Sequence, residues 1–134
     1  MNDRKRIIRQ WFRLAKEALG DAEYNLQGKR FKTCVNRLYY AVFYAASALL
    51  LTKGLSSGKH EGIRKLFHRE FIKTEILDVH WGQFYDKSYG DRLAADYRLM
   101  PRFTFSYLDE RLKKMKQFLR LIRKYLSSEG VWKK

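Results

Sequence analysis

The feature that most constrains this chain is an apolar run from Leu38 to Leu51, which only Ser47 interrupts. Because the run contains no charged residue, a helix built from it is apolar on every face and needs protein on all sides. Its fourteen residues fall short of the roughly 18–20 that a membrane-spanning helix needs. We therefore expect residues 31–53 to form the central helix of a bundle, ended by Gly54.

Four further segments show the helical period, in which apolar residues recur at intervals of three or four. They cover about residues 4–27, 59–71, 78–97 and 105–127. The last is the clearest, because one stripe runs along its whole length, formed by Leu108, Leu112, Met115, Leu119, Ile122 and Leu126. Gly82 and Gly90 weaken the helical preference of the segment 78–97, and Pro101 is expected to close it off.

These segments predict an all-α fold, an up-down helical bundle of four to five helices in a single domain spanning residues 1–134. Alternation of the strand type occurs only at residues 102–106 and is too short to matter. A helix of about 22 residues is roughly 33 Å long, which suits such a bundle.

The charge of the chain is strongly positive and unevenly placed. It has 29 Lys and Arg against 14 Asp and Glu, a formal net charge of +15. Residues 98–124 are basic and residues 74–97 acidic, and the basic face of the last helix comprises Arg111, Lys113, Lys114, Lys116, Arg120, Arg123 and Lys124. Such a surface fits RNA or another polyanion, bound in a salt-dependent way. It also fits a solvated face that keeps the chain soluble.

The sequence gives no sign of export or membrane association. Residues 1–13 are basic and lack the apolar stretch of a signal peptide. The apolar stripes of the helices are needed for the core rather than for a membrane surface. Cys34 is the only cysteine, so no internal disulfide can form. We expect a cytoplasmic protein with no membrane partner.

Residue types that carry common catalytic and cofactor chemistry are sparse. His60 and His68 are eight residues apart, and no acidic residue joins them at the spacing of metal ligands. The loop at residues 56–60 lacks the spacing of a phosphate-binding P-loop. Cys34 has no base nearby in the sequence and is expected to be a small core residue. We therefore expect no metal and no cofactor.

One polar constellation lies on the central helix. Arg37, Tyr40 and Tyr44 are three and four residues apart and so share a face. Buried tyrosine hydroxyls need hydrogen-bond partners, and a buried arginine needs a carboxylate. The three side chains could be a polar pin that holds the helices together, or one wall of a polar cleft between helices.

A second constellation lies at the end of the segment 78–97. Arg92 and Asp96 are four residues apart and can pair along the helix, with Tyr97 next in sequence. An exposed pair of this kind contributes only about 0.2–0.5 kcal/mol. The same spacing gathers a guanidinium, a carboxylate and a phenol at one helix end. The guanidinium suits a phosphate, although Asp96 competes for it.

Several stretches resemble the HEPN domain superfamily, in particular its small prokaryotic UPF0332-like branch. They are Asn36–Phe43 (NRLYYAVF), Ala48–Gly54 (ALLLTKG), Lys59–Ile63 (KHEGI), Leu66–Phe67, Glu70–Thr74 (EFIKT) and Arg92–Tyr97 (RLAADY). The resemblance covers roughly Leu14 to Leu126. It implies an up-down bundle that forms a homodimer and is often encoded beside a minimal nucleotidyltransferase, in pairs of the toxin–antitoxin type.

Several HEPN branches are metal-independent endoribonucleases, and their signature is an Arg followed after four to six residues by a His. This chain lacks that signature: the equivalent place is Arg92 with Tyr97, so only the arginine matches. The resemblance implies catalytic roles for Arg92 and Tyr97, the tyrosine as a hydrogen-bond donor or as an acceptor of a nucleotidyl group. A phenol with a pKa near 10 is a poor general base at pH 7. Lys59 and His60 join Asp96, Arg37, Tyr40 and Tyr44 as candidate binding residues.

Three hypotheses about function follow. The first is a dimeric module that binds RNA or a nucleotide and partners a nucleotidyltransferase, with little or no catalysis. The second is an endoribonuclease toxin in which Arg92 stabilises the scissile phosphate and Tyr97 or His60 assists proton transfer. The third is a non-catalytic helical scaffold whose basic faces serve solubility.

Overall fold

The structure is a computed structural model that describes residues 2–97 and 103–133. Every regular element in these ranges is helical. The elements are α1 (Asn2–Gln27), α2 (Phe31–Leu51), α3 (His60–Phe67), the π-helical turn η1 (His68–Ile72), α4 (Val79–Tyr97) and α5 (Phe105–Ser128). The predicted all-α class is confirmed, and the five predicted segments match the helices closely. Pro101, expected to close off α4, lies outside the described residues.

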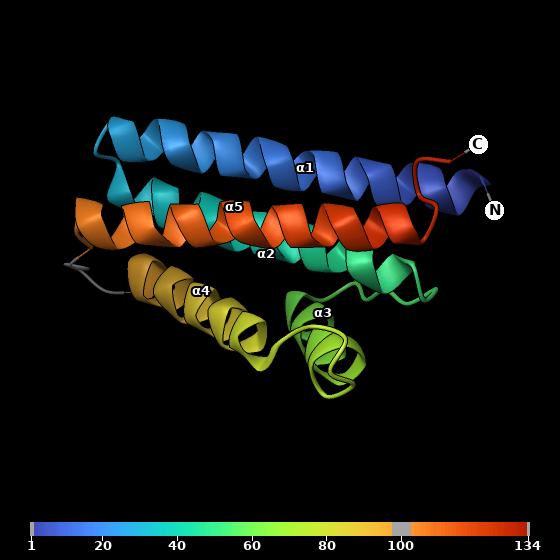
Figure 1. The fold of residues 1–134 in the computed structure, drawn as a ribbon. Coiled ribbons are helices and arrows are strands. Elements are labelled where there is room, and N and C mark those ends of the chain that lie inside the picture. The colour runs from blue at the N-terminus through green and yellow to red at the C-terminus, as the bar shows by residue number, and fades with distance from the viewer. Residues whose placement is uncertain (1, 98–102, 134) are drawn as a thin grey trace.

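The long helices run up and down. α1 and α2 form an antiparallel hairpin, α5 lies beside α1, and the two chain ends lie at the same end of the bundle (Figure 1). α4 runs opposite to α5, while the short α3 and η1 stand at the end of α2 from which the chain leaves it (Figure 1). α2 contacts α1, α3, α4 and α5, so the predicted central helix is central.

Burial explains why α2 tolerates so apolar a sequence. By length and composition alone α2 could cross a membrane, but 72% of its most apolar window is buried inside the bundle. Its buried residues include Cys34, Tyr39 and Phe43. The neighbouring helices therefore supply the apolar surroundings that the sequence demands, and α2 is a core helix.

Local chemistry fixes the ends of the helices. After α2, Gly54 has a φ of 72°, a left-handed conformation that glycine adopts without strain. At the start of α5, the backbone N–H of Tyr107 donates to Thr104 Oγ1 at 3.1 Å, which is an N-cap. The turn from α1 to α2 is closed by the Arg30 N–H, which donates to the carbonyl of Asn25 at 2.8 Å.

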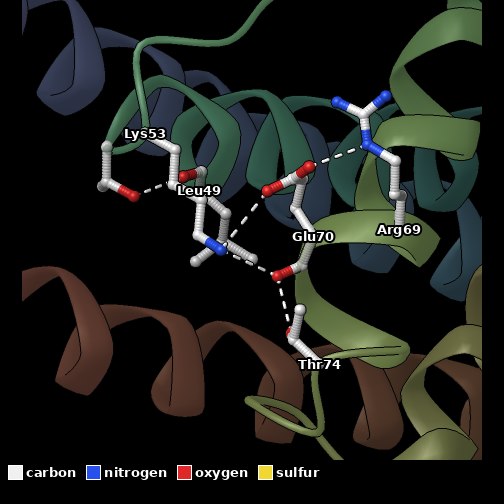
Figure 2. A network of polar contacts seen from close by, with 6 residues as sticks. Leu49, Lys53, Arg69, Glu70 and Thr74 are labelled. Atoms are coloured by element: carbon white, nitrogen blue, oxygen red, sulfur yellow. Dashed lines mark hydrogen bonds and ion pairs between the residues drawn. The ribbon is translucent and has the colours of Figure 1, made fainter.

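The turn η1 is attached to the end of α2 through Glu70. Lys53 Nζ donates to the Glu70 carbonyl at 2.9 Å and lies 3.5 Å from its carboxylate, while Arg69 Nε donates to that carboxylate at 2.7 Å (Figure 2). Thr74 Oγ1 also donates to the Glu70 carbonyl, at 2.7 Å. These contacts place α3 and η1 against the end of the bundle, and with them the residue that begins α3, His60.

Candidate functional site

Three helices bring an arginine, two tyrosines and a histidine together. α4 supplies Arg92, whose Cζ lies 4.8 Å from the ring centroid of Tyr39 and 5.7 Å from that of Tyr40, both on α2. α3 begins with His60, whose ring centroid is 5.4 Å from that of Tyr40. We call Arg92, Tyr39, Tyr40 and His60 the Arg92 cluster. A guanidinium over aromatic faces is held in place without its donors being consumed.

Arg92 is partly buried, and one of its guanidinium nitrogens is left without a hydrogen bond to the described residues. Its side chain is 24% exposed, and its Nε is buried with no hydrogen-bond partner among the described residues. Asp96 Oδ2 lies 3.4 Å from Nε, close enough for an ion pair but not in hydrogen-bonding geometry. The predicted Arg92–Asp96 pair therefore forms, but loosely, and the guanidinium remains able to bind an anion.

His60 lies against an apolar surface beside a positive charge. Its ring centroid is 4.2 Å from that of Phe43, which packs under the cluster. Burial, and then the positive charge of Arg92, lower the pKa of His60 below its usual 6.5. The imidazole is therefore neutral at pH 7 and can accept a proton.

The predicted face of α2 adjoins this cluster. Arg37 Cζ lies 5.0 Å from the Tyr40 centroid, and its donors bind Asn36 Oδ1 at 3.0 and 2.7 Å rather than a carboxylate. The ring of Tyr44 is 5.8 Å from that of Tyr40. Lys59 is exposed immediately before His60. The candidate binding residues Arg37, Tyr40, Tyr44, Lys59 and His60 thus lie near one another and near Arg92.

Tyr97 is placed differently. It is the last residue of α4 and 81% exposed, and it has no hydrogen bond or ring contact within residues 2–97 and 103–133. Five helical residues turn the chain by about 500°, so Tyr97 lies roughly 140° around α4 from Arg92. The phenol beside the guanidinium is that of Tyr39, which is 1% exposed. In the sequence, the adjacent tyrosines Tyr39 and Tyr40 on the central helix are the feature that could have indicated this phenol.

A second polar network, which the sequence analysis did not anticipate, continues along α3 and α4. Arg64 donates to Asp86 at 2.6 Å and to Glu61 at 2.7 Å, and His68 Nε2 lies 2.9 Å from the same Asp86 oxygen. Burial opposes the charge on Arg64, but the hydrogen bonds that Arg64 donates to Asp86 and Glu61, with the negative charges of these two residues, outweigh burial and raise the pKa of Arg64. Nearby, the hydroxyl of the fully buried Tyr85 has no partner within the described part of the chain. The interface between α3 and α4 therefore contains partly buried polar side chains.

Residues 2–97 and 103–133 contain no group of three His, Cys, Asp or Glu that could hold a metal ion. Cys34 is fully buried, and burial raises the pKa of its thiol to about 11. The thiol is therefore protonated at neutral pH and poorly nucleophilic, as expected of a core residue.

The basic face of α5 is smaller than its sequence indicates. Arg111 donates to the Phe84 carbonyl at 3.1 Å and to Ser88 Oγ at 3.2 Å, so it joins α5 to α4. Lys116 donates to Glu23 on α1 at 2.7 Å. The face that stays exposed consists of Lys113, Lys114, Arg120, Arg123 and Lys124.

The fold and the Arg92 cluster define a small helical domain built around an arginine near the end of its fourth helix. The chain belongs to the HEPN domain family, whose model matches residues 8–125. It is 40% identical over 126 residues to a UPF0332 protein of Thermotoga maritima, an alignment that covers 94% of this chain and 96% of that protein.

Two archaeal relatives extend the comparison. A Methanocaldococcus jannaschii protein named "Putative toxin MJ0142" is 34% identical over 129 residues, covering 96% of this chain and 88% of the relative. A UPF0332 protein of Pyrococcus horikoshii is 25% identical over 115 residues, covering 86% and 75%. The family expected from the sequence is thereby confirmed.

Proposed function

We propose that this protein is a cytoplasmic HEPN module that binds a phosphate of RNA or of a nucleotide at the Arg92 cluster. The observation that carries the proposal is the guanidinium of Arg92, which is held over the rings of Tyr39 and Tyr40 while its buried Nε has no hydrogen-bond partner among the described residues. Arg37 and Lys59 add positive charge nearby, and Tyr40 and Tyr44 offer half-buried rings to a base. A phosphate would thus bind Arg92 while a neighbouring base stacks on Tyr40 or Tyr44 in the same site.

Binding of labelled single-stranded RNA, measured by fluorescence anisotropy in low salt, tests this proposal. Arg92→Gln should weaken binding by roughly 10- to 150-fold, because one charge-assisted contact is worth roughly 1.5–3 kcal/mol. Arg92→Lys, which keeps the charge but loses the planar fork, should recover only part of the affinity. Lys124→Gln removes one charge from an exposed position on α5 and is the matched control. Equal losses in Arg92→Gln and Lys124→Gln would show that only net charge matters.

A second candidate function is metal-independent RNA cleavage, favoured by the neutral imidazole of His60 beside Arg92. In this reaction His60 takes the proton of a ribose 2′-hydroxyl, whose oxygen then attacks the adjacent phosphorus. The 5′-oxygen leaves with a proton from water, and a 2′,3′-cyclic phosphate forms while Arg92 stabilises the charge on the phosphate oxygens. Cleavage in the presence of a chelator should disappear in His60→Gln and in Arg92→Ala. Equal cleavage by wild type and Arg92→Ala would remove this candidate.

We further propose a homodimer and a nucleotidyltransferase partner. Ile7 and Leu14 are 40% and 37% exposed on one face of α1, on either side of the half-buried Trp11, and could bury apolar surface against a second copy. Light scattering should then give twice the 16.2 kDa of the chain. A monomer at micromolar concentration would contradict the dimer.

A further inference from the structure

A groove between α1 and α5 is not part of the Arg92 cluster. It encloses about 380 Å³, within the range of roughly 300–1,000 Å³ that is usual for ligand sites. Its floor is apolar, formed by Phe12, Leu19 and Leu119. α1 and α5 lie side by side along their length (Figure 1), so the groove follows two antiparallel helices.

Gly20 leaves one wall of this groove open. A Cβ built at Gly20 would meet no atom within 4 Å, so packing within the described chain does not require a glycine there. Glycine in the middle of a helix costs about 1 kcal/mol relative to alanine. The absent side chain instead keeps space free above the apolar floor.

The rim of the groove is cationic. Around the floor lie Lys16, Lys116, Arg120 and Arg123, and Glu23 is the one acidic residue among the lining residues that the structure describes. Glu23 is already paired with Lys116 at 2.7 Å. Within residues 2–97 and 103–133, Lys16, Arg120 and Arg123 have neither an ion pair nor a hydrogen bond from the side chain. Arg123 Cζ lies 4.4 Å from the ring centroid of Trp132 and Lys16 Nζ lies 5.7 Å from that of Phe12, contacts that do not neutralise their charges. Three positive charges without a carboxylate partner among these residues therefore border an apolar slot.

We propose that this groove docks an acidic, amphipathic helix of a partner protein. The groove between two packed helices receives the side-chain ridge of a third, so leucine-like residues of the partner would enter the open space beside Gly20 and contact Leu19, above the buried Phe12 and Leu119. Acidic residues flanking that ridge would meet Lys16, Arg120 and Arg123. From Phe12 to Glu23 the wall measures about 16 Å, or three turns of helix.

Charge and shape argue against two other occupants. A second copy that met the first groove to groove would set Lys16, Arg120 and Arg123 against the same three positive charges, unlike a contact through the apolar face of Ile7 and Leu14. Nucleic-acid bases stack on open aromatic faces, whereas the ring of Phe12 is only 3% exposed and the other floor residues are aliphatic. An acidic, amphipathic helix would pair its carboxylates with the basic rim and pack its apolar side chains on the floor.

The test uses a fluorescein-labelled helical peptide of about 18 residues, long enough to hold helix in isolation. It carries leucine on one face and glutamate elsewhere, and its binding to the full chain is measured by anisotropy. Wild-type protein should bind it, and should bind a peptide with glutamine in place of leucine about tenfold more weakly. The absence of binding to wild type, or equal binding of the two peptides, would overturn the proposal.

Groove-filling variants supply the sharper comparison. Gly20→Met should weaken peptide binding about tenfold or more while leaving the thermal midpoint equal or higher, because its side chain enters open space. Gly90→Met is the matched control: Gly90 lies on α4, and a Cβ there also meets no atom of the described residues within 4 Å. The double variant Arg120→Gln/Arg123→Gln should bind more weakly and with less dependence on salt.

Three results would contradict an acidic-helix site. Unchanged peptide affinity in Gly20→Met would show that the peptide binds elsewhere. A change of oligomeric state in Gly20→Met would assign the groove to a second copy of the chain. Weaker binding of single-stranded RNA by Gly20→Met, with the peptide unaffected, would assign it to nucleic acid.

Discussion

At the scale of single residues, the environment of His60 decides what the Arg92 cluster can do. Packing against Phe43 and the charge of Arg92 both favour the neutral ring, so its pKa is lowered in the folded state. A group with a lowered folded-state pKa contributes stability that is present above its unfolded pKa, near 6.5, and is lost as pH falls through the folded value.

We therefore predict that the free energy of unfolding falls between pH 7 and pH 5, and falls less in His60→Gln. Urea unfolding at several pH values measures this difference. An NMR titration of the His60 ring should give a midpoint below 6.5, and Arg92→Gln should move that midpoint upward. An unchanged midpoint in Arg92→Gln would mean that the guanidinium does not act on the ring.

Tyr97 presents the opposite situation, a phenol in solvent at the end of a helix. If the partner is a nucleotidyltransferase, this phenol can attack the α-phosphorus of a nucleoside triphosphate, displace pyrophosphate and keep the nucleotidyl group. We predict a mass increase of one nucleoside monophosphate in wild type and its loss in Tyr97→Phe. Tyr24→Phe is the control, since Tyr24 is 80% exposed against 81% for Tyr97. Modification of Tyr97→Phe at the wild-type level would contradict this assignment.

At the scale of the elements, Gly82 shows how a residue that weakens a helix serves its packing. A Cβ at Gly82 would lie 2.8 Å from Cε1 of His68, so the glycine lets the His68 ring lie against α4. We predict that Gly82→Ala destabilises the fold by about 1–3 kcal/mol, a typical cost of overpacking. Gly90→Ala, at the same kind of helical position with open space around it, should instead stabilise by up to about 1 kcal/mol. Thermal unfolding of the two variants gives the comparison.

The helices were predictable because their signals are local. The period of apolar residues and the stops at Gly28 and Gly54 set the ranges of α1 and α2 to within about two residues. Two features were not predictable from local signals: the turn η1, and the hydrogen bond that Arg111 on α5 donates to α4. Each depends on which helices pack against each other. Arg92 and Tyr97 were likewise grouped because both lie near one helix end, whereas packing of α4 on α2 brings Arg92 to Tyr39.

At the scale of the whole molecule, the net charge of +15 permits either a polyanion partner or a merely solvated surface. The two differ in where the charges must lie. A surface that only keeps the protein soluble needs a net charge, wherever the charged residues lie. A binding site needs basic residues close to the group that binds the ligand, as Arg37 and Lys59 are close to Arg92. Self-repulsion among 29 basic groups opposes compactness in both cases and is screened by salt.

Salt titrations separate these possibilities. Screening predicts that the thermal midpoint rises with salt in every variant, while RNA affinity falls with salt only if phosphates are contacted. For single-stranded RNA, each phosphate contact contributes about −0.7 to the slope of log K against log salt. We predict that Arg92→Gln reduces the magnitude of this slope by about 0.7, and that Lys124→Gln leaves it nearly unchanged. Identical slopes for wild type and Arg92→Gln would show that RNA, if bound, is held away from the Arg92 cluster.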